Sequence, residues 1–566
     1  MGSKSHTCVL VSDFNQQNFA GFAANDPDFP KIEPISAPFG QPVETLLSRD
    51  MPCWQDAPDF AVIWTQPQSV IPAFKKLLNF EQVSLQQVLE QVDEYSDLLA
   101  TMRERVRYTL IPSWVLASDR RIFGVLDMQP EIGLTHTIMR MNLRLAENLA
   151  KVSGVYVLNA NSWIARAGSQ AFSPKLWYLG KIPFGNDVFK AAVADIKAAL
   201  RGMLGYSRKL IILDLDDTLW GGIVGEAGWE NLVLGGHHHR GEAHADLQRT
   251  LKSLRNRGIL LAIVSKNEEP VALEAIRKHP EMVLQLEDFA AWRINWQDKA
   301  RNIIDLLSEL NLGPQSAVFI DDNPAERARV KESLPEVLVP DLPQDPLLYP
   351  TALLSLRCFE LPSLSREDLA RTAMYHSENK RRDLKKTVAS LAQWLARLAT
   401  RIQVEELHPA NLPRAVQLLN KTNQMNLSTR RMTESELMAW SKEQHHRLWT
   451  LRVSDRFGDA GLTGIVSLEI QDGRAQIVDF VLSCRVLGRQ VEETMLAVAI
   501  QHVQAMGIND VYAHYVATAK NKPCLEFFKN ATPRLQQRGD LFIWHGKQAF
   551  PLPEHIEIVS DIASNF

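Results

Sequence analysis

Four short polar stretches contain residues whose types and spacing can do chemistry. Each one follows an apolar run or begins a helical one. They are DLDDT (214–218), SKN (265–267), Lys299 within NWQDKARNI, and DDNP (321–324). Together they supply carboxylates, hydroxyl groups and a lysine, which is the set of groups that phosphoryl transfer uses.

A carboxylate that attacks phosphorus needs its own negative charge masked, and Mg²⁺ held by oxygen ligands does this. We expect Asp214 to be the nucleophile, and Asp216 to protonate the leaving oxygen and then activate water. Ser265 and Lys299 would stabilise charge on the transferring group. The predicted catalytic residues are Asp214, Asp216, Thr218, Ser265 and Lys299; the predicted phosphate-binding residues are Ser265, Lys266, Asn267 and Lys299; the predicted Mg²⁺ ligands are Asp214, Asp216, Asp321 and Asp322.

Three apolar runs must position these groups. Residues 209–216, 259–265 and 316–321 are continuous apolar segments that end in a polar residue, with helical segments at 241–257 and 298–311 between them. Continuous apolar strands are typical of a parallel sheet covered by helices on both faces. Ligands of such sheets bind at the carboxyl ends of the strands, where Asp214, Ser265 and Asp321 fall.

The spacing leaves room only for a small flap, GGIVGEAGWENLVLGG (221–236), between Asp214 and the helix that starts near Gly241. We expect no separate cap domain there or between Ser265 and Lys299. Such a site is open to a bulky substrate or to a macromolecular partner. Alternatively, another domain of the chain acts as its lid.

The rest of the chain divides around this unit. Residues 1–205 alternate strand-like runs with helical stretches, which predicts a first α/β unit before the catalytic unit at 206–345. A proline-rich linker and a charged helix are expected at 346–399, and a mixed unit of strands and helices at 400–566. The basic run at 380–386 is expected to be a solvated helix face, with docking of an acidic carrier protein as the alternative.

Composition narrows the class of protein. A length of 566 residues suits about three domains, and a net charge of −4 excludes the basic footprint of a nucleic-acid-binding protein. Five cysteines without a CxxC pair predict reduced thiols and no zinc site. No run approaches the length of a membrane span. We therefore expect a cytoplasmic protein with neither nucleic acid nor membrane as a partner.

The four stretches resemble the four motifs of the haloacid dehalogenase (HAD) superfamily over roughly residues 206–345. DLDDTLWGGIVGE, IVSKNEEP, NWQDKARNI and FIDDNPAERARV further resemble the FkbH family, a branch without a cap domain. This resemblance continues outside the unit, in WYLGKIPFGNDVF (177–189), KTNQMNLSTRRM (421–432), VSDRFGDAGLTGIV (453–466), LSCRVLGRQVEE (482–493) and YVATAKNKP (515–523).

The family resemblance implies a multi-domain α/β fold. It consists of an N-terminal unit like SGNH hydrolases, a HAD-like Rossmannoid core without a large cap, and a C-terminal mixed α/β unit like GNAT acyltransferases. It also implies an activity. Family members take the glyceryl group of 1,3-bisphosphoglycerate, a small phosphorylated metabolite, remove its phosphate and load it as a thioester on a phosphopantetheinylated acyl carrier protein in polyketide-type biosynthesis.

Two positions depart from the family pattern. Leu215 lies where glyceryl-loading relatives often have a cysteine, and leucine cannot form a thioester. Arg485 and Gly488 resemble the start of the acetyltransferase pyrophosphate-binding loop, but Gln490 replaces its final small residue. A phosphopantetheine site and a plain structural turn both remain open there. Cys484 beside this loop is expected to be a buried structural cysteine, with a surrogate acyl-accepting thiol as the alternative.

Three functions therefore compete. The first is a Mg²⁺-dependent phosphatase and glyceryl transferase acting on a carrier protein. The second is a HAD phosphatase on another phosphorylated substrate, which Leu215 favours. The third is a GNAT-type acyltransferase with a regulatory HAD core. In the first unit, VSDFN (11–15) does not read Gly-Asp-Ser, so we expect a scaffold or docking role there and not esterase activity.

Overall fold

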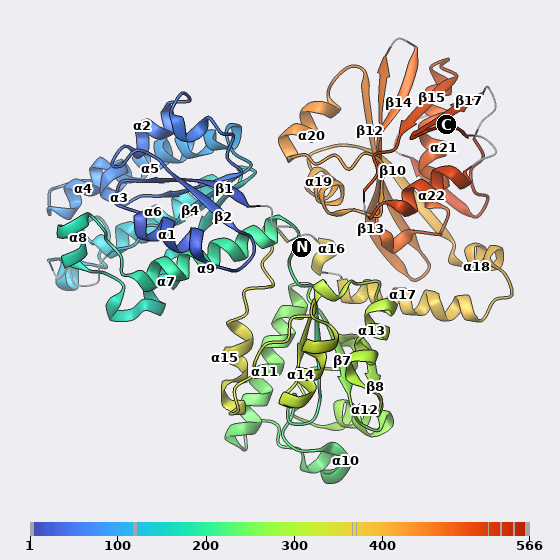
Figure 1. Cartoon of the computed structure of the whole chain (residues 1–566), viewed down its shortest axis with the longest axis horizontal. Helices are drawn as coiled ribbons and strands as arrows, with labels where there is room; N and C mark the ends of the chain where they lie inside the picture. Colours follow the sequence, from blue (N-terminus) through green and yellow to red (C-terminus); the bar gives the residue numbers. More distant parts are fainter. Residues whose placement is uncertain are drawn as a thin grey trace. The chain divides into compact units, whose positions relative to one another are not determined.

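The computed structural model describes residues 5–116, 122–364, 366–369, 371–471, 473–518, 520–531, 535–546 and 550–560. The chain forms two compact units, Met1–Leu204 and Gly205–Phe566 (Figure 1). Among the helices in these ranges, none has both the length and the apolar character needed to cross a membrane.

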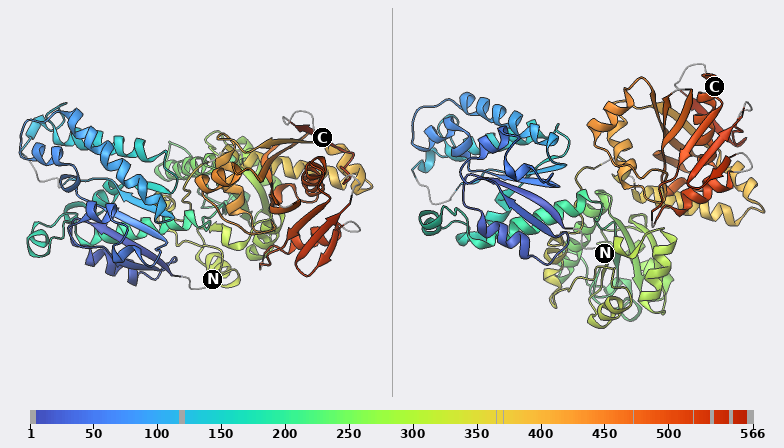
Figure 2. Two further views of the ribbon diagram at one scale, coloured as in Figure 1. Left: turned by 90° about the horizontal axis from the view of Figure 1, so that it is seen from above. Right: turned by 45° about the horizontal axis from the view of Figure 1, so that its top comes forward.

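The first unit is built on a parallel five-stranded sheet in the order β2-β1-β3-β4-β5. Val9 and Val11 of β1 face the core under α5 and α6, whereas Cys8 and Leu10 face the core under α1 and α9. Helices therefore cover both faces of this sheet, as two further views show (Figure 2). The elements are β1 (His6–Ser12), β2 (Ile32–Ser36), β3 (Phe60–Trp64), β4 (Tyr108–Pro112), β5 (Val155–Leu158), α1 (Gln17–Asn25), α5 (Leu85–Ala100), α6 (Leu134–Leu149) and α9 (Asn186–Met203).

The polar residues that follow β1 hold a turn. The Ser12 hydroxyl accepts a hydrogen bond from the Phe14 backbone N–H at 3.0 Å. The Asp13 carboxylate accepts one from the Gln66 backbone N–H at 2.8 Å and contacts the Ser69 hydroxyl. These contacts give both side chains structural roles. The likeness of this unit to SGNH hydrolases stays a prediction.

The second unit begins with a parallel four-stranded sheet in the order β8-β7-β6-β9. Its strands are β6 (Leu210–Leu213), β7 (Leu260–Ser265), β8 (Phe289–Ile294) and β9 (Ala317–Ile320). Three of them were expected. The sequence FAAWRI of β8 was missed because tryptophan and arginine interrupt its apolar run. The flanking helices are α11 (His239–Asn256), α12 (Glu269–Lys278), α13 (Lys299–Glu309) and α14 (Pro324–Ser333).

The segment between β6 and α11 is a small flap, as expected. Within residues 214–238, all of which the structure describes, the regular elements are the four-residue helix α10 (Val224–Ala227) and a 3-10 turn at Trp229–Asn231. The flap is tied back by backbone pairing of Gly221 with Val233. A side chain at Gly221 would lie 3.1 Å from the Val233 Cβ atom, so this close approach favours glycine.

The segment expected to be a linker contributes to the core. Tyr349 and Leu353 of α15 (Tyr349–Leu354), together with Phe359, are buried in the apolar cluster that also contains β6 and β7. The core of the phosphatase-like part thus extends beyond residue 345, because these apolar side chains cover the α11 side of the sheet.

The remainder of the second unit is a mixed sheet in the order β16-β17-β15-β14-β13-β12-β10-β18. β14 runs parallel to β15 but pairs with it only through Ala475–Ile477, and the short β11 pairs with its far end. The elements are β10 (Thr400–Glu406), α19 (Leu412–Lys421), β11 (Met425–Asn426), α20 (Glu434–Ser441), β12 (His446–Asp455), β13 (Gly458–Gln471), β14 (Arg474–Leu482), α21 (Val491–Ala505), β15 (Asp510–His514), α22 (Lys522–Asn530), β16 (Leu535–Arg538), β17 (Leu541–His545) and β18 (Ile556–Ser560).

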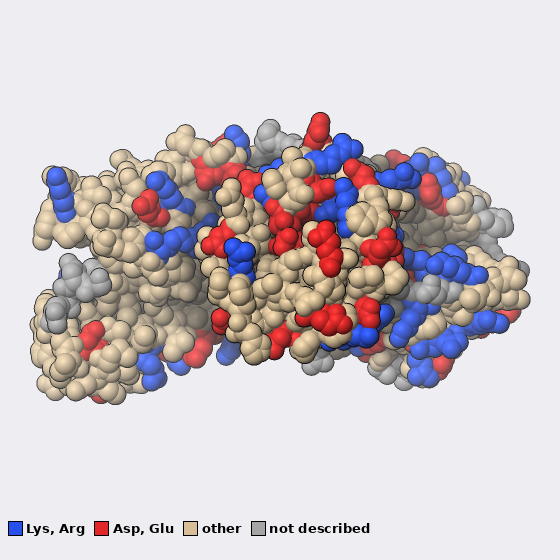
Figure 3. Space-filling view, turned by 90° about the horizontal axis from the view of Figure 1, so that it is seen from below, with Lys and Arg blue, Asp and Glu red and all other residues tan. Residues whose placement is uncertain are grey.

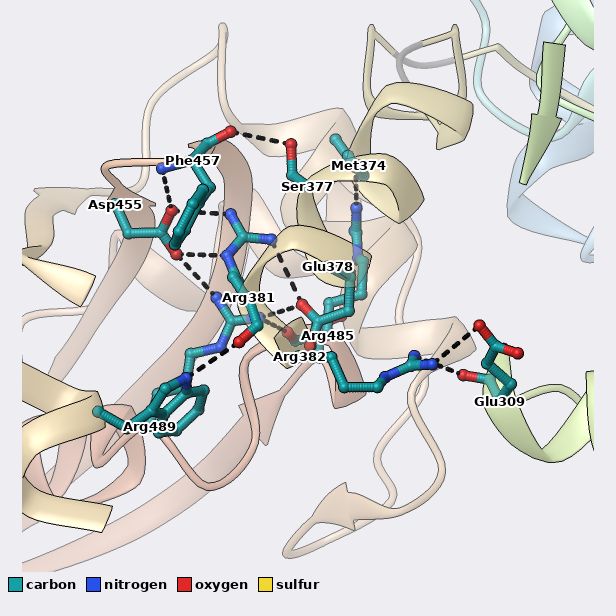
Figure 4. A network of polar contacts seen from close by, with 12 residues as sticks. Glu309, Met374, Ser377, Glu378, Arg381, Arg382, Asp455, Phe457, Arg485 and Arg489 are labelled. Atoms are coloured by element: carbon teal, nitrogen blue, oxygen red, sulfur yellow. Dashed lines mark hydrogen bonds and ion pairs between the residues drawn. The ribbon is translucent and has the colours of Figure 1, made fainter. Parts of the chain in front are cut away.

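Helix α17 (Arg371–Lys386) connects the two parts of this unit through charged contacts (Figure 4). Asp455, whose side chain is only 1% exposed, lies 2.6 Å from the Arg381 Nε atom and 3.2 Å from an Arg489 nitrogen. Arg382 forms an ion pair with Glu309 of α13 at 3.0 Å. The expectation of a solvated basic face is therefore wrong for Arg381 and Arg382, because carboxylates of the two parts bind them.

Replacing Asp455 with alanine tests this network. The change removes a carboxylate that pairs with the buried guanidinium groups of Arg381 and Arg489. We therefore expect a loss of about 3–5 kcal/mol in the free energy of unfolding. The matched control is Asp459→Ala, which removes an exposed pairing with Arg452 and is expected to cost at most about 1 kcal/mol. Urea unfolding measures both. Equal losses for the two variants would contradict the assigned role of the network.

Candidate active site

Three strands end at one edge of the four-stranded sheet and bring the predicted residues together. Asp214 follows β6, Ser265 ends β7 and Asp321 follows β9. Lys299 is the first residue of α13, whose N-cap Asp298 accepts a hydrogen bond from the Arg301 backbone. The parallel register of the sheet places the three strand ends side by side, since neighbouring parallel strands end at the same edge.

A buried lysine links the two aspartates at the centre of this edge. The Lys299 Nζ atom lies 2.6 Å from Asp321 Oδ2 and 3.0 Å from Asp214 Oδ1. All three side chains are buried. Asp214, Asp321 and Asp322 each offer a carboxylate oxygen, and these oxygens lie within 4.8 Å of one another.

This cluster fits a divalent cation. Three carboxylates against one lysine leave two negative charges, and the buried Asp214 Oδ1 lies 3.0 Å from the Lys299 Nζ atom. Carboxylate oxygens are the ligands that Mg²⁺ uses in proteins. Asp214, Asp321 and Asp322 are therefore the residues that would hold it.

Burial and like charges shift the pKa values of these groups. Burial, and then the neighbouring Asp321, raise the pKa of Asp214 to about 7, against the opposing effect of Lys299. Burial and Asp321 likewise raise the pKa of Asp322. Burial lowers the pKa of Lys299, but Asp214 and Asp321 raise it by more, so the ammonium group stays charged. Without a cation, the cluster therefore retains a proton near neutral pH.

Asp216 lies outside the cluster, although the sequence placed it among the metal ligands. Its carboxylate accepts hydrogen bonds from the Trp220 indole N–H at 2.9 Å, the Val224 backbone N–H at 3.1 Å and the Asn267 amide at 2.8 Å. These donors fix the orientation of the carboxylate beside the flap. Such a position suits proton transfer, because its oxygens are not engaged with the cluster.

Hydroxyl and amide side chains contact the loops that carry Asp214 and Asp322. The Thr218 hydroxyl donates to Asp322 Oδ1 and accepts from the Asp322 backbone N–H, both at 3.1 Å. Ser265 lies close enough to Asp214 to lower the pKa of that carboxyl group, and the Asn267 amide lies 3.4 Å from the Ser265 hydroxyl oxygen. Thr218, Ser265 and Asn267 therefore all lie at the site.

Lys266, in contrast, was predicted to bind phosphate but is paired within the protein. Its Nζ atom lies 2.6 Å from a carboxylate oxygen of Glu326 in α14. The charge of Glu326 thus balances that of Lys266, and Lys299 is left as the lysine in contact with the aspartate cluster.

The second predicted phosphate site, at Arg485 and Gly488, is filled by the chain itself. The Gly488 N–H donates to the Glu492 carboxylate at 2.8 Å, so a carboxylate takes the place proposed for a pyrophosphate oxygen. Burial raises the pKa of Glu492 to about 6. Gln490 has a φ of 61°, a left-handed conformation that favours glycine and explains the small residue in the usual pattern. Cys484 is exposed, so the expectation of a buried cysteine is wrong.

Sequence reasoning missed the residues that hold the loops of the site. The buried His244 and Gln248 of α11 contact the carbonyl oxygens of Thr218 and Leu219. The Arg327 guanidinium donates to the carbonyl oxygens of Asp321 and Asp322. Arg327 stands five residues after Asp322, and no simple spacing rule marks such a contact.

Comparison with solved structures identifies a similar phosphatase domain. The crystal structure of the N-terminal part of the protein BF1531 from Bacteroides fragilis, which contains a phosphatase domain complexed with Mg, is 28% identical. The alignment covers 64% of this chain and 95% of the chain in that structure, with a TM-score of 0.58. The match confirms the sequence prediction of an enzyme of the phosphatase type, and Mg is the metal that the sequence predicted. An alignment over 64% of the chain is longer than residues 206–345 alone.

Two acetyltransferases also align with part of the chain. The ribosomal-protein-S18-alanine N-acetyltransferase of Escherichia coli is 8% identical, covering 25% of this chain and 90% of its own with a TM-score of 0.19. A GNAT-family acetyltransferase of Staphylococcus aureus is 11% identical, covering 25% and 98% with a TM-score of 0.20. Scores this low carry no inference. No protein-family model and no curated protein matches the chain.

The raised pKa of Asp214 predicts a pH-dependent affinity for Mg²⁺. Since its folded-state pKa of about 7 lies above the usual 3.8, the metal-free protein holds an extra proton on folding and loses stability as pH rises through 7. Mg²⁺ displaces this proton, so its affinity should rise with pH up to about 7 and then level off. Titration calorimetry in buffers of different ionisation enthalpy measures the released proton; an affinity independent of pH would contradict the assignment.

Matched amide substitutions separate the cluster from Asp216. Asp322→Asn removes a predicted ligand, so Mg²⁺ affinity should fall by at least about tenfold. Asp216→Asn removes the same charge from a carboxylate outside the cluster and should weaken Mg²⁺ binding by less. Calorimetric titration of both variants at one pH makes the comparison. A larger loss with Asp216→Asn would mean that Asp216 is a ligand after all.

Proposed function

We propose that the chain is a Mg²⁺-dependent HAD-superfamily phosphatase and acyl transferase of the FkbH family. It dephosphorylates a phosphoglycerate-type donor, 1,3-bisphosphoglycerate, and loads the glyceryl group as a thioester on an acyl carrier protein in polyketide-type biosynthesis. The observation that carries the phosphatase activity is the buried cluster of Asp214, Asp321 and Asp322 around Lys299. The choice of donor and acceptor rests on the family resemblance of the sequence.

The residues of the site divide the phosphoryl transfer between them. An Asp214 oxygen attacks the phosphorus of the phosphate ester at C3 of the donor, and the bond between that phosphorus and the ester oxygen breaks as Asp216 gives the oxygen a proton. Water then attacks the aspartyl phosphate and returns a proton to Asp216 as phosphate leaves. Lys299 and Ser265 stabilise the charge of the transferring group. Bound Mg²⁺ would mask the charges of Asp214, Asp321 and Asp322 and polarise the phosphoryl oxygens.

The buried position of Leu215 limits the route by which the acyl group can be transferred. Its side chain is completely buried in the apolar core that also contains Leu213 and Trp220. No acyl group can be held there. In the proposed reaction the carrier's thiol therefore attacks the activated carboxyl carbon of the donor directly. A sulfur–carbon bond forms at C1, the bond from C1 to the acyl phosphate oxygen breaks, and the departing phosphate takes up the thiol proton. The phosphate that Asp214 removes is the ester at C3.

The segment between β6 and α11 forms only a small flap, and in the proposed reaction a carrier protein approaches the site past it. Figure 3 shows acidic side chains over much of the phosphatase-like part and basic side chains gathered beyond it. Exposed basic residues that suit an acidic carrier include Lys380, Lys385 and Lys386 of α17. Electrostatic complementarity of this kind speeds association and orients the partner.

A plain phosphatase on another phosphorylated substrate is the second candidate. Leu215 favours it, because the chain lacks a thiol between its two aspartates. An acyltransferase that works through the C-terminal part is less favoured, since Glu492 already accepts the hydrogen bond of Gly488.

One experiment separates these functions. The protein is incubated with Mg²⁺, 1,3-bisphosphoglycerate generated in situ and a panel of phosphopantetheinylated carrier proteins, and the mass of each carrier is measured. We expect a glyceryl adduct on one carrier and no such adduct with Asp214→Ala. Phosphate release without an adduct on any carrier would favour the plain phosphatase. An adduct that survives Asp214→Ala and requires acyl-CoA would favour the acyltransferase.

The phosphatase step has its own control. Asp214→Ala should lower the rate of phosphate release by at least about a thousandfold, because no other group supplies the nucleophile. Asp246→Ala removes an exposed carboxylate of α11 that pairs with Arg249 and should leave the rate unchanged. A small loss with Asp214→Ala would contradict covalent catalysis by this residue.

A further inference from the structure

Two tryptophans lie beside the loop that follows Ser265. Trp292 belongs to β8, and Trp296 lies between β8 and α13, three residues before Lys299. Trp296 is 67% exposed, whereas Trp292 is partly buried. Three residues of chain span at most about 11 Å, so the Trp296 indole stands at the rim of the candidate active site.

Both indoles are bound to the segment that carries Ser265. The Trp296 indole N–H donates to the Glu268 carboxylate at 2.8 Å, and the Trp292 indole N–H donates to the Glu269 carboxylate at 3.2 Å. Glu268 follows Ser265 by three residues and precedes α12. The exposed ring of Trp296 is therefore held against the loop that supplies a residue of the site.

The backbone around Trp296 is also fixed. The Asn295 backbone N–H donates to the Ser265 carbonyl oxygen at 3.1 Å. The Asn295 side-chain oxygen accepts hydrogen bonds from the Gln297 backbone N–H and the Asn302 amide, both at 2.9 Å. The indole is thus oriented before any ligand binds, which lowers the entropic cost of binding one.

The flap places a second apolar side chain near this loop. A Cβ atom at Gly225 of the flap would lie 4.0 Å from the Asn267 Oδ1 atom, so the flap approaches the segment after β7 closely. Ile223, two residues earlier in the flap, is 44% exposed. An exposed apolar side chain therefore stands on each of the two segments that approach the loop, Ile223 on one and Trp296 on the other.

The carboxylates beside the indoles disfavour an anionic ligand at the rim. Glu268 and Glu269 are both exposed, and acidic side chains cover much of this part of the molecule (Figure 3). Like charges repel a phosphate or a nucleotide from the indole surface. The rim therefore suits an uncharged chain with apolar groups, whereas an anionic donor is attracted to the buried Lys299.

We propose that Trp296 packs against the pantetheine arm of the carrier protein and so positions its thiol at C1 of the donor. This inference rests on the proposed function. With the C3 phosphate of the donor at Asp214, C1 lies at the other end of the three-carbon chain, and an arm that delivers a thiol to C1 crosses the rim. Between its phosphate and its thiol the arm is an uncharged chain of amides, methylene groups and a dimethyl group, which an indole face can cover.

Fluorine NMR of the full-length protein labelled with 5-fluorotryptophan tests this contact without turnover. The Trp296 resonance is identified by its loss in Trp296→Phe, and free pantetheine is the probe. We expect a saturable shift of this resonance, reaching about 90% of its limit at ten times the Kd. Trp440 of α20, identified through Trp440→Phe, is the control and should not shift.

Two outcomes of this titration would overturn the proposal. One is the lack of a saturable shift at Trp296, or an equal shift at Trp440. The other is a larger shift with tetramethylammonium than with the same concentration of pantetheine, because an indole beside two carboxylates also suits a cation.

Steady-state loading separates the contact from the proposed function. Trp296→Ala should raise the KM for the carrier protein about tenfold with little change in kcat, whereas a merely structural role would lower kcat. Trp296→Phe keeps an aromatic ring and should raise KM by less. Ile304→Ala removes a 51% exposed apolar side chain farther along α13 and should leave KM unchanged.

Failure of the contact and failure of the function give different results. Loading by the wild-type protein with an unchanged KM in Trp296→Ala would overturn the contact and leave the function standing. Absence of loading by the wild-type protein would count against the function, and the fluorine titration then decides whether Trp296 binds pantetheine.

Discussion

The placement of Lys299 between Asp214 and Asp321 is the constraint on which the active site depends. Two carboxylates that end adjacent strands cannot both stay charged in a buried position unless a cation compensates them. One lysine compensates only part of the charge, and Asp322 adds more. The sheet therefore brings together a set of oxygens that is stable only with a proton or a cation. This makes the edge reactive and accounts for its need for a metal.

The same principle of buried charge operates at two other places in the second unit. Around α17, Arg381 and Arg489 surround Asp455, and the pairing joins helix and C-terminal sheet into one body. At the start of α21, the Glu492 carboxylate accepts a hydrogen bond from the Gly488 N–H group. An internal carboxylate there satisfies the positive end of a helix, which removes the simplest reason for an external phosphate to bind.

Much of the catalytic unit could be predicted from the sequence, because the relevant signals are local. Each apolar run ends in a polar residue of the candidate site, and parallel strands bring those ends together without further information. Where the local signal was interrupted, the prediction failed. The strand FAAWRI was missed, and the segment around Tyr349 and Leu353 was taken for a linker because its prolines masked the apolar side chains that enter the core. The basic run of α17 was misread because its partners Asp455 and Glu309 are distant in sequence.

The sequence alone determined which residues form the candidate site, the order of three of the four strands around it and the absence of space for a large insertion between Asp214 and α11. It did so because residue types, apolar runs and spacing are properties of the chain itself. Only the tertiary structure decided how those residues divide their tasks. It grouped Asp214, Asp321 and Asp322, set Asp216 aside on three donors, paired Lys266 with Glu326 and buried Leu215 in the core. These outcomes depend on distances between residues far apart in sequence, which packing alone establishes.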